Sequence, residues 1–184
     1  MATIRLAGLS TICIMTAALL APEAARACGP LIEVNYLETD GDVMTIRNRS
    51  EQAWALESLT FNMTTSRGSI IFDTVYGGPG SNAARDFYVI SGNGKLLAPP
   101  LVEDGGSVML MAFTDFGPGR EIDFAIDLDD RMANSIMGNA YVTGEEIMGG
   151  EVSGKLRSPG GYEMDVRGVF NEKNVAHLTS PACV

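Results

Sequence analysis

The sequence predicts an all-β protein, a single antiparallel β-sandwich of the immunoglobulin-like or jelly-roll-like kind, with about ten strands and little helix. Polar and apolar residues alternate along much of the chain, which is the period of a strand with one buried face. Turn-forming residues recur at short intervals, and glycine is frequent, at 21 of 184 residues. Hydrophobic residues make up 46% of the chain and charged residues 20%, which is a globular composition.

Residues 1–27 have the features of a secretory signal peptide. Arg5 supplies a positive charge, residues 6–20 are mostly apolar, and the Ala-Arg-Ala sequence at 25–27 is a cleavage pattern. A membrane anchor is the alternative, but it needs about 20 apolar residues. We therefore expect a secreted or periplasmic protein that consists of one domain, 28–184, with no transmembrane segment in the mature chain.

Two cysteines remain in the mature chain, Cys28 at its start and Cys183 near its end. An even pair in an oxidising compartment predicts a disulfide, and the termini of a domain often lie close together. Lipidation of Cys28 is the alternative, but Ala25 and Arg26 fit the lipoprotein pattern poorly. We expect a disulfide between Cys28 and Cys183.

The strands of the first half are separated by clear turn signals. A Thr-Asp-Gly-Asp turn at 39–42 and Asn93-Gly94 each predict a hairpin, and a glycine-rich loop occupies 77–82. The strands expected before residue 100 are 31–37, 43–48, 54–63, 69–75, 87–90 and 95–97.

The second half continues the pattern. Residues 108–113 are apolar at consecutive positions, which predicts that 107–113 is a central strand buried on both faces. Residues 130–137 are expected to form one short helical turn. The remaining strands are expected at 121–129, 139–143, 147–156 and 162–170.

The 121–129 segment alternates regularly and predicts which side chains enter the core. One face carries only apolar residues, which we expect to be buried together: Ile122, Phe124, Ile126 and Leu128. Asp127 and Asp129 share the opposite face and are expected to lie outside the core.

The carboxylates of this segment predict a weak Ca²⁺ site, because Ca²⁺ prefers six to eight hard oxygen ligands. The candidate ligands are Asp123, Asp127, Asp129 and Asp130. The turn that contains Asp104 is a further source of a carboxylate. A solvated acidic sheet edge is the alternative. Ca²⁺ is the one cofactor that the sequence suggests.

Charge and motifs exclude several functions. The formal net charge of −10 argues against binding to nucleic acid or to an anionic membrane. The single histidine, His177, excludes a multi-histidine metal site. Neither a Gly-x-Ser-x-Gly nor a His-Glu-x-x-His motif occurs. We therefore expect no catalytic residues and no enzymatic activity.

Several short motifs, taken in order, resemble a known family. They are Ile71-Phe72-Asp73, Val102-Glu103-Asp104-Gly105, Phe116-Gly117-Pro118-Gly119, Phe124-Ala125-Ile126-Asp127-Leu128-Asp129-Asp130, Gly144-Glu145-Glu146-Ile147-Met148-Gly149-Gly150 and the Ala182-Cys183 ending. The chain resembles the bacterial aggregation factor core proteins, small secreted proteins named for similarity to a sponge cell-adhesion component. The resemblance covers most of 40–184 and departs from the family pattern at Gly150 and after Asp130. It implies an extracellular β-sandwich with an adhesive role, which in the sponge system depends on calcium.

We therefore expect an exported, non-enzymatic β-sandwich that acts in calcium-assisted cell-surface adhesion or matrix binding. Its partner would be a cell-surface protein or a polysaccharide. The second hypothesis is a periplasmic ligand-binding or hydrolytic protein that uses its acidic surface and the 77–82 loop.

Overall fold

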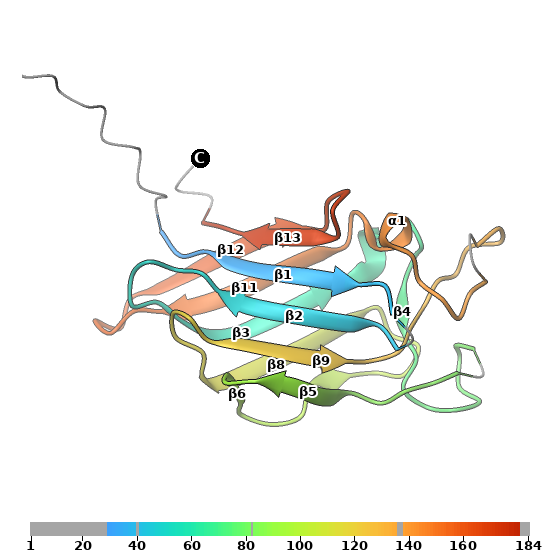
Figure 1. Cartoon of the computed structure of the whole chain (residues 1–184), viewed down its shortest axis with the longest axis horizontal. Helices are drawn as coiled ribbons and strands as arrows, with labels where there is room; N and C mark the ends of the chain where they lie inside the picture. The colour runs from blue at the N-terminus through green and yellow to red at the C-terminus, as the bar shows by residue number, and fades with distance from the viewer. Residues whose placement is uncertain (1–28, 40, 82, 136–137, 181–184) are drawn as a thin grey trace, which may run out of the picture.

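The computed structural model describes residues 29–39, 41–81, 83–135 and 138–180 (Figure 1). The signal peptide predicted at 1–27, together with Cys28 and Cys183, lies outside the described residues. The described chain contains thirteen strands in antiparallel sheets and almost no helix, so the all-β prediction is confirmed. No helix among these residues is long and apolar enough to cross a membrane.

One layer is a five-stranded sheet in the order β13-β1-β2-β9-β5. Its strands are β1 (Ile32–Leu37), β2 (Val43–Asn48), β5 (Tyr88–Gly92), β9 (Glu121–Ala125) and β13 (Val175–Leu178). The β1–β2 hairpin is the one that the turn at 39–42 predicts.

The second layer is a six-stranded sheet in the order β12-β11-β3-β8-β6, with β7 also paired to β8. Its strands are β3 (Ala55–Asn62), β6 (Lys95–Leu96), β7 (Leu101–Val102), β8 (Val108–Asp115), β11 (Glu151–Arg157) and β12 (Glu163–Val169). Figure 1 shows the five-stranded sheet lying across this second sheet.

The two sheets are linked along both sides. On one side an isolated bridge pairs Arg167 with Thr179, just after β13. On the other side the Asn93-Gly94 turn leads from β5 in one sheet to β6 in the other. The hairpin expected at this turn is therefore wrong, because β5 pairs with β9 and β6 pairs with β8. The inner faces form one apolar core, in which Phe61 packs edge-on against Phe124 with ring centroids 6.1 Å apart.

The 121–129 segment is divided between two sheets, which corrects one expectation. β9 ends at Ala125, and a separate short strand, β10 (Leu128–Asp129), pairs with β4 (Ile71–Phe72). The predicted apolar face is confirmed, since its four residues are buried: Ile122, Phe124, Ile126 and Leu128. The expectation that Asp127 and Asp129 lie outside the core is wrong, since both are buried. The chain leaves the five-stranded sheet after Ala125 and pairs with β4, so these two residues do not continue the outer face of β9.

Strand β8 corrects a second expectation. Met109 and Met111 are fully buried, but Val108 and Leu110 on the other face are exposed. β8 is central within its sheet, between β3 and β6, but only one sheet packs against it. A continuous apolar run therefore does not show that both faces are covered.

Further differences lie before and after β10. Strands β7 and β13 form where the sequence predicted none. The described part of 130–137 holds no helix, and no strand forms at 139–143. Instead, the short helix α1 (Gly144–Ile147) precedes β11. A 3-10 turn, η1 (Met63–Thr65), follows β3.

Candidate metal centre

Three aspartates meet at the end of the sandwich where β4 and β10 pair. Asp73 directly follows β4, Asp127 precedes β10, and Asp129 lies in β10. One carboxylate oxygen from each residue lies within 4.8 Å of the others. The antiparallel pairing causes this proximity, and the Asp73 N–H donates to the carbonyl oxygen of Asp127 at 3.0 Å. We call these three residues the aspartate cluster.

The aspartate cluster is almost completely buried. The exposed fractions are 0% for Asp73, 5% for Asp127 and 1% for Asp129. Four buried carboxylate oxygens accept no hydrogen bond: both oxygens of Asp73, Oδ2 of Asp127 and Oδ1 of Asp129. A buried carboxylate is costly unless it is paired, hydrogen-bonded or bound to a metal. The unpartnered oxygens therefore favour a cation at this position.

Burial also raises the pKa of each carboxyl group in the aspartate cluster. The pKa of Asp127 rises to about 7, chiefly through burial and then through repulsion by Asp129, while Arg85 opposes the rise. The pKa values of Asp73 and Asp129 are raised mainly by burial as well. Three like charges in one buried place are unfavourable, so either protons or a cation must stabilise them.

The glycine-rich loop at 77–81, which we call the glycine loop, covers the aspartate cluster. The backbone N–H of Ser81 donates to Oδ2 of Asp129. A Cβ at Gly80 would overlap the carboxylates of Asp73 and Asp129. Only glycine allows the backbone to approach the carboxylates this closely.

Asp42 lies behind the aspartate cluster and holds β10 in place. Its Oδ2 accepts the N–H of Leu128 at 2.9 Å, and its Oδ1 lies 2.6 Å from the hydroxyl of Tyr36. That hydroxyl is also 2.6 Å from the carbonyl oxygen of Val142. A tyrosine hydroxyl has one proton, so both short contacts are hydrogen bonds only when the Asp42 carboxyl is protonated. Burial, the main cause, raises the pKa of Asp42 to about 6.

The structure brings together only two of the four ligands expected from the sequence. Asp127 and Asp129 belong to the aspartate cluster. Asp123 lies on the outer face of β9, where it accepts hydrogen bonds from Thr45 and Ser91, each 2.6 Å long. It is therefore not placed to share an ion with the cluster.

Asp130 is also used elsewhere. It accepts the N–H of Met132 at 2.8 Å, the Ser135 hydroxyl at 2.6 Å and the Asn139 amide at 2.9 Å. These bonds shape the chain after β10. Asp130 is therefore a structural neighbour of the cluster.

Sequence reasoning missed Asp73 as a ligand. Asp73 lies at the end of a predicted strand, far along the chain from Asp127, and only the β4–β10 pairing makes them neighbours. The presence of Asp73 in the first motif of the family resemblance was the one signal that could have drawn attention to it.

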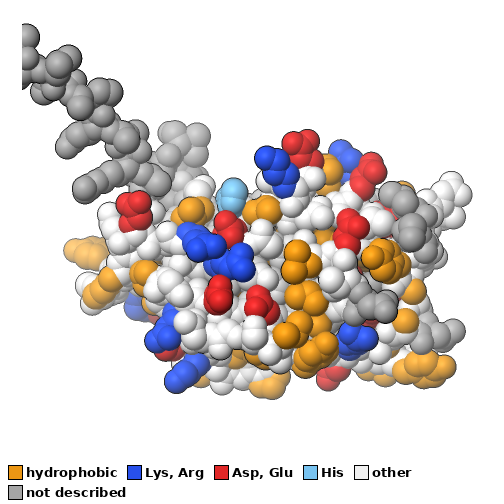
Figure 2. All heavy atoms as spheres, in the orientation of Figure 1, with side chains coloured by type: hydrophobic (Ala, Val, Ile, Leu, Met, Phe, Trp, Pro, Cys, Tyr) orange, Lys and Arg blue, Asp and Glu red, His pale blue; other side chains and the backbone are white. Residues whose placement is uncertain are grey.

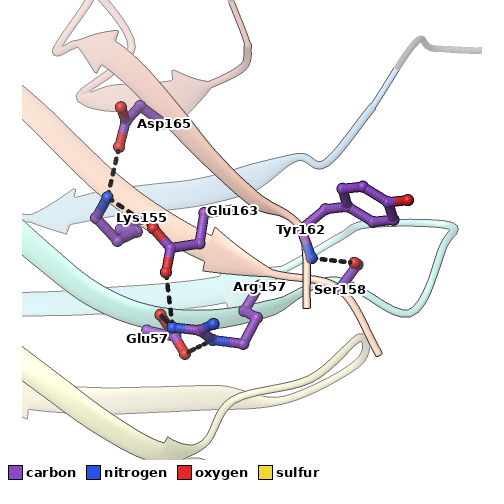
Figure 3. A network of polar contacts seen from close by, with 7 residues as sticks. All are labelled: Glu57, Lys155, Arg157, Ser158, Tyr162, Glu163 and Asp165. Atoms are coloured by element: carbon purple, nitrogen blue, oxygen red, sulfur yellow. Dashed lines mark hydrogen bonds and ion pairs between the residues drawn. The ribbon is translucent and has the colours of Figure 1, made fainter. Parts of the chain in front are cut away.

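Several acidic residues elsewhere on the surface are paired with bases. Figure 3 shows Arg157 between Glu57 and Glu163 on the outer face of the six-stranded sheet. Lys155 is likewise paired with Glu163 and Asp165, at 3.4 and 3.5 Å. Such exposed pairs contribute little to stability.

The five-stranded sheet carries a similar arrangement. Its outer face shows basic and acidic side chains next to each other (Figure 2). Arg47 contacts Glu121 at 3.0 Å and Glu33 at 3.6 Å, and His177 contacts Glu33 at 3.6 Å. In the described chain only the aspartate cluster groups three or more potential ligands closely enough to share an ion.

A surface pocket of about 560 Å³ adjoins the aspartate cluster. Gly80, Ser81 and Asp129 line one side of it, and Met132 and Asn139 contribute to the remainder. Asp129 and the glycine loop therefore belong to both the buried cluster and the open pocket. A change in the cluster would alter the shape of the pocket.

The geometry suits a hard divalent cation. Ca²⁺ binds oxygens at about 2.3–2.6 Å, so ligands on opposite sides of the ion are roughly 5 Å apart. The oxygens of the cluster fit within such a shell. No family model, curated protein or solved structure matches this chain.

Proposed function

We propose that this protein is an exported, non-enzymatic β-sandwich that binds Ca²⁺ and acts in calcium-assisted adhesion to a cell surface or matrix. The observation that carries the proposal is the aspartate cluster, Asp73, Asp127 and Asp129, with its four buried and unpartnered carboxylate oxygens. A divalent cation would supply the missing partners of these oxygens and remove their mutual repulsion.

The position of the cluster supports a role in binding. A cation there would join β4, β10 and the 77–81 loop at one end of the sandwich. Loops at the end of a rigid sandwich are a common location for recognition. The pocket beside Asp129 offers a concave surface at this same end. The resemblance to aggregation factor core proteins, where adhesion is the implied role, points in the same direction.

The first experiment tests the ion. The purified protein, freed of metal with EGTA, is titrated with CaCl₂ and with MgCl₂ by calorimetry at matched ionic strength. We expect one Ca²⁺ per chain and weaker binding of Mg²⁺, which demands a smaller and more regular shell. Absence of Ca²⁺ binding by the wild-type protein would refute the proposal.

The second experiment tests adhesion. Beads coated with the protein should aggregate, or bind a matrix polysaccharide, in Ca²⁺ and disperse in EGTA. Beads coated with Asp73→Asn should not respond to Ca²⁺, whereas beads coated with Asp123→Asn should behave like wild type. If wild type, Asp73→Asn and Asp123→Asn respond to Ca²⁺ in the same way, adhesion does not depend on the aspartate cluster, and the proposed adhesive role of the cation site is wrong.

One observation favours the ligand-binding or hydrolytic alternative. Asp129 borders the pocket, and the raised pKa of Asp127, about 7, suits a general acid or base. Hydrolysis, however, requires substrate to reach carboxylate oxygens that are buried. A hydrolase would retain activity in EGTA and lose it when Ca²⁺ occupies the cluster, which is the opposite of the behaviour expected for adhesion.

A further inference from the structure

We infer that Asp104 and Gly80 are positioning residues of the cation site. They hold residues 74–81, which we call the covering loop, over the aspartate cluster, so that bound Ca²⁺ leaves only when this loop lifts. The inference rests on the proposed cation function. It adds two residues that position the loop without being ligands of the ion.

Asp104 fixes the first end of the covering loop. Its Oδ1 accepts the N–H of Thr74 at 2.8 Å, the N–H of Val75 at 3.0 Å and the Thr74 hydroxyl at 3.2 Å. These bonds begin one residue after the ligand Asp73. Hydrogen bonds to a charged acceptor are stronger than those between neutral groups. Asp104 therefore determines the direction in which the chain leaves Asp73.

The turn that carries Asp104 is itself held against β4. Gly105 donates to the carbonyl oxygen of Phe72, and Phe72 donates to that of Gly106, both at 2.8 Å. A Cβ at Gly105 would lie 2.6 Å from Cγ of Pro79, so this turn also contacts the middle of the covering loop. The turn thus provides a fixed support for the loop at two points.

The second end of the covering loop contacts two residues of the aspartate cluster, Asp73 and Asp129. Ser81 donates its N–H to Asp129, and the missing side chain of Gly80 leaves room for the carboxylates of Asp73 and Asp129. A turn within the loop is closed by the N–H of Gly78, which donates to the carbonyl oxygen of Val75 at 2.9 Å. The loop is therefore attached at both ends and folded between them.

This arrangement explains why the aspartate cluster is buried although it lies at a loop-rich end of the domain. Val75 and Tyr76 at the outer part of the covering loop are exposed, while the ligand Asp73 beneath it is inaccessible to water. An ion bound to the unpartnered oxygens would be enclosed in the same way. Its exit requires that the bonds to Asp104 or Asp129 open first.

The test measures the rate of Ca²⁺ release. Ca²⁺-loaded protein is mixed rapidly with an excess of a fluorescent chelator, and the dissociation rate is recorded. Gly80→Ala and Asp104→Ala should release Ca²⁺ at least about tenfold faster than wild type. Asp104→Ala removes an attachment of the loop, and the Cβ of Gly80→Ala would overlap the carboxylates of Asp73 and Asp129 and so push the loop away from them. Gly117→Ala is the matched control, since nothing lies within 4 Å of a Cβ at Gly117.

A conservative variant separates positioning from charge. Asn at position 104 can still accept the N–H groups of Thr74 and Val75, through weaker bonds than a carboxylate accepts. Asp104→Asn should therefore release Ca²⁺ more slowly than Asp104→Ala, at a rate nearer to that of wild type. Melting in EGTA shows whether each variant is folded; a merely structural role for Asp104 would lower this melting temperature without changing the release rate.

The outcomes are distinguishable. If the wild-type protein binds no Ca²⁺, the proposed function and this inference both fail. If wild type binds Ca²⁺ and folded Gly80→Ala and Asp104→Ala release it at the wild-type rate, only the inference about the covering loop fails. Faster release from Asp104→Ala, with recovery in Asp104→Asn, supports it.

Discussion

Asp123 and Asp129 are six residues apart in sequence, but their carboxylates lie in very different environments. Asp123 lies on a sheet face and accepts two side-chain hydroxyl hydrogen bonds. Asp129 is buried, and its Oδ1 has no hydrogen-bond partner. A charged carboxylate costs little free energy at the hydrogen-bonded position of Asp123 and much more at the buried position of Asp129. The two residues therefore form a natural matched pair for mutation.

The first prediction concerns the Asp129→Asn variant. Saturating wild type with about 10 mM Ca²⁺ at a dissociation constant near 1 mM should add about 1.4 kcal/mol to the free energy of unfolding. Asp129→Asn should lose this gain and melt at an equal or higher temperature than wild type in EGTA, because one buried charge is gone. Differential scanning calorimetry measures both effects. Asp123→Asn should retain the calcium-dependent shift, and a retained shift in Asp129→Asn would contradict the assignment.

The second prediction concerns pH and the pKa of Asp127. This pKa is raised from 3.8 to about 7 in the folded protein, so between these values the folded state binds more protons than the unfolded state. The free energy of unfolding in EGTA should therefore fall as pH rises from 5 to 8, by an amount on the order of 2 kcal/mol. Asp42, whose pKa is about 6, should add to the fall.

Calcium should oppose this pH dependence, because it binds the deprotonated carboxylates and competes with protons. Melting temperatures measured from pH 5 to pH 8, in EGTA and in Ca²⁺, should converge at low pH and diverge at high pH. A melting temperature in EGTA that increases steadily with pH over this range would show that the aspartate cluster does not hold excess protons.

At the scale of an element, strand β8 shows that position within a sheet and burial are separate properties. Its inward residues Met109 and Met111 are fully buried in the core between the sheets, whereas Leu110 between them points outward. Pairing with β3 and β6 satisfies the backbone of the strand without covering its outer face. The period of two applies even where every residue in the run is apolar.

The third prediction follows from this one-sided burial. Met111→Ala should lower the free energy of unfolding by about 2–5 kcal/mol, since it leaves a cavity between the sheets. Leu110→Ala, on the exposed face, should cost about 1 kcal/mol or less. Chemical denaturation compares the two variants directly. Equal losses would mean that an undescribed segment or a second molecule covers the outer face.

At the scale of the whole molecule, the first and last described strands are neighbours. Ile32 at the start of β1 lies opposite Leu178 at the end of β13. The antiparallel pairing therefore directs the two ends of the described chain to the same end of the sandwich (Figure 1). Cys28 precedes Ile32 by a few residues and Cys183 follows Leu178 by a few residues.

The fourth prediction is the disulfide between Cys28 and Cys183. Peptide mapping of protein that is expressed in an oxidising compartment and kept unreduced should recover the two cysteines in one cross-linked fragment. Reduction should lower the free energy of unfolding by about 2–5 kcal/mol, because the bond closes nearly the whole mature chain into one loop. Free thiols in the folded protein, or lipid on Cys28, would contradict the assignment.

The local pattern of the sequence was sufficient for most strands and for the core. The alternation in 43–48 and in 121–125 corresponds to β2 and β9, and the apolar residues Ile122 and Phe124 are buried as expected. Alternation succeeds there because the two faces of a strand are set by backbone geometry alone, with no reference to distant residues.

Only the tertiary structure decided which carboxylates are buried together. The alternation places Asp127 and Asp129 on the polar face of a continuous strand, but the chain leaves the sheet after Ala125 and β10 pairs with β4 instead. That pairing brings in Asp73, and the covering loop excludes water. Sheet exchange and loop closure depend on contacts between residues far apart in sequence, which no local period encodes. The sequence alone therefore determined which segments are strands and that this stretch is acidic, whereas the fold determined that three acids share one buried place.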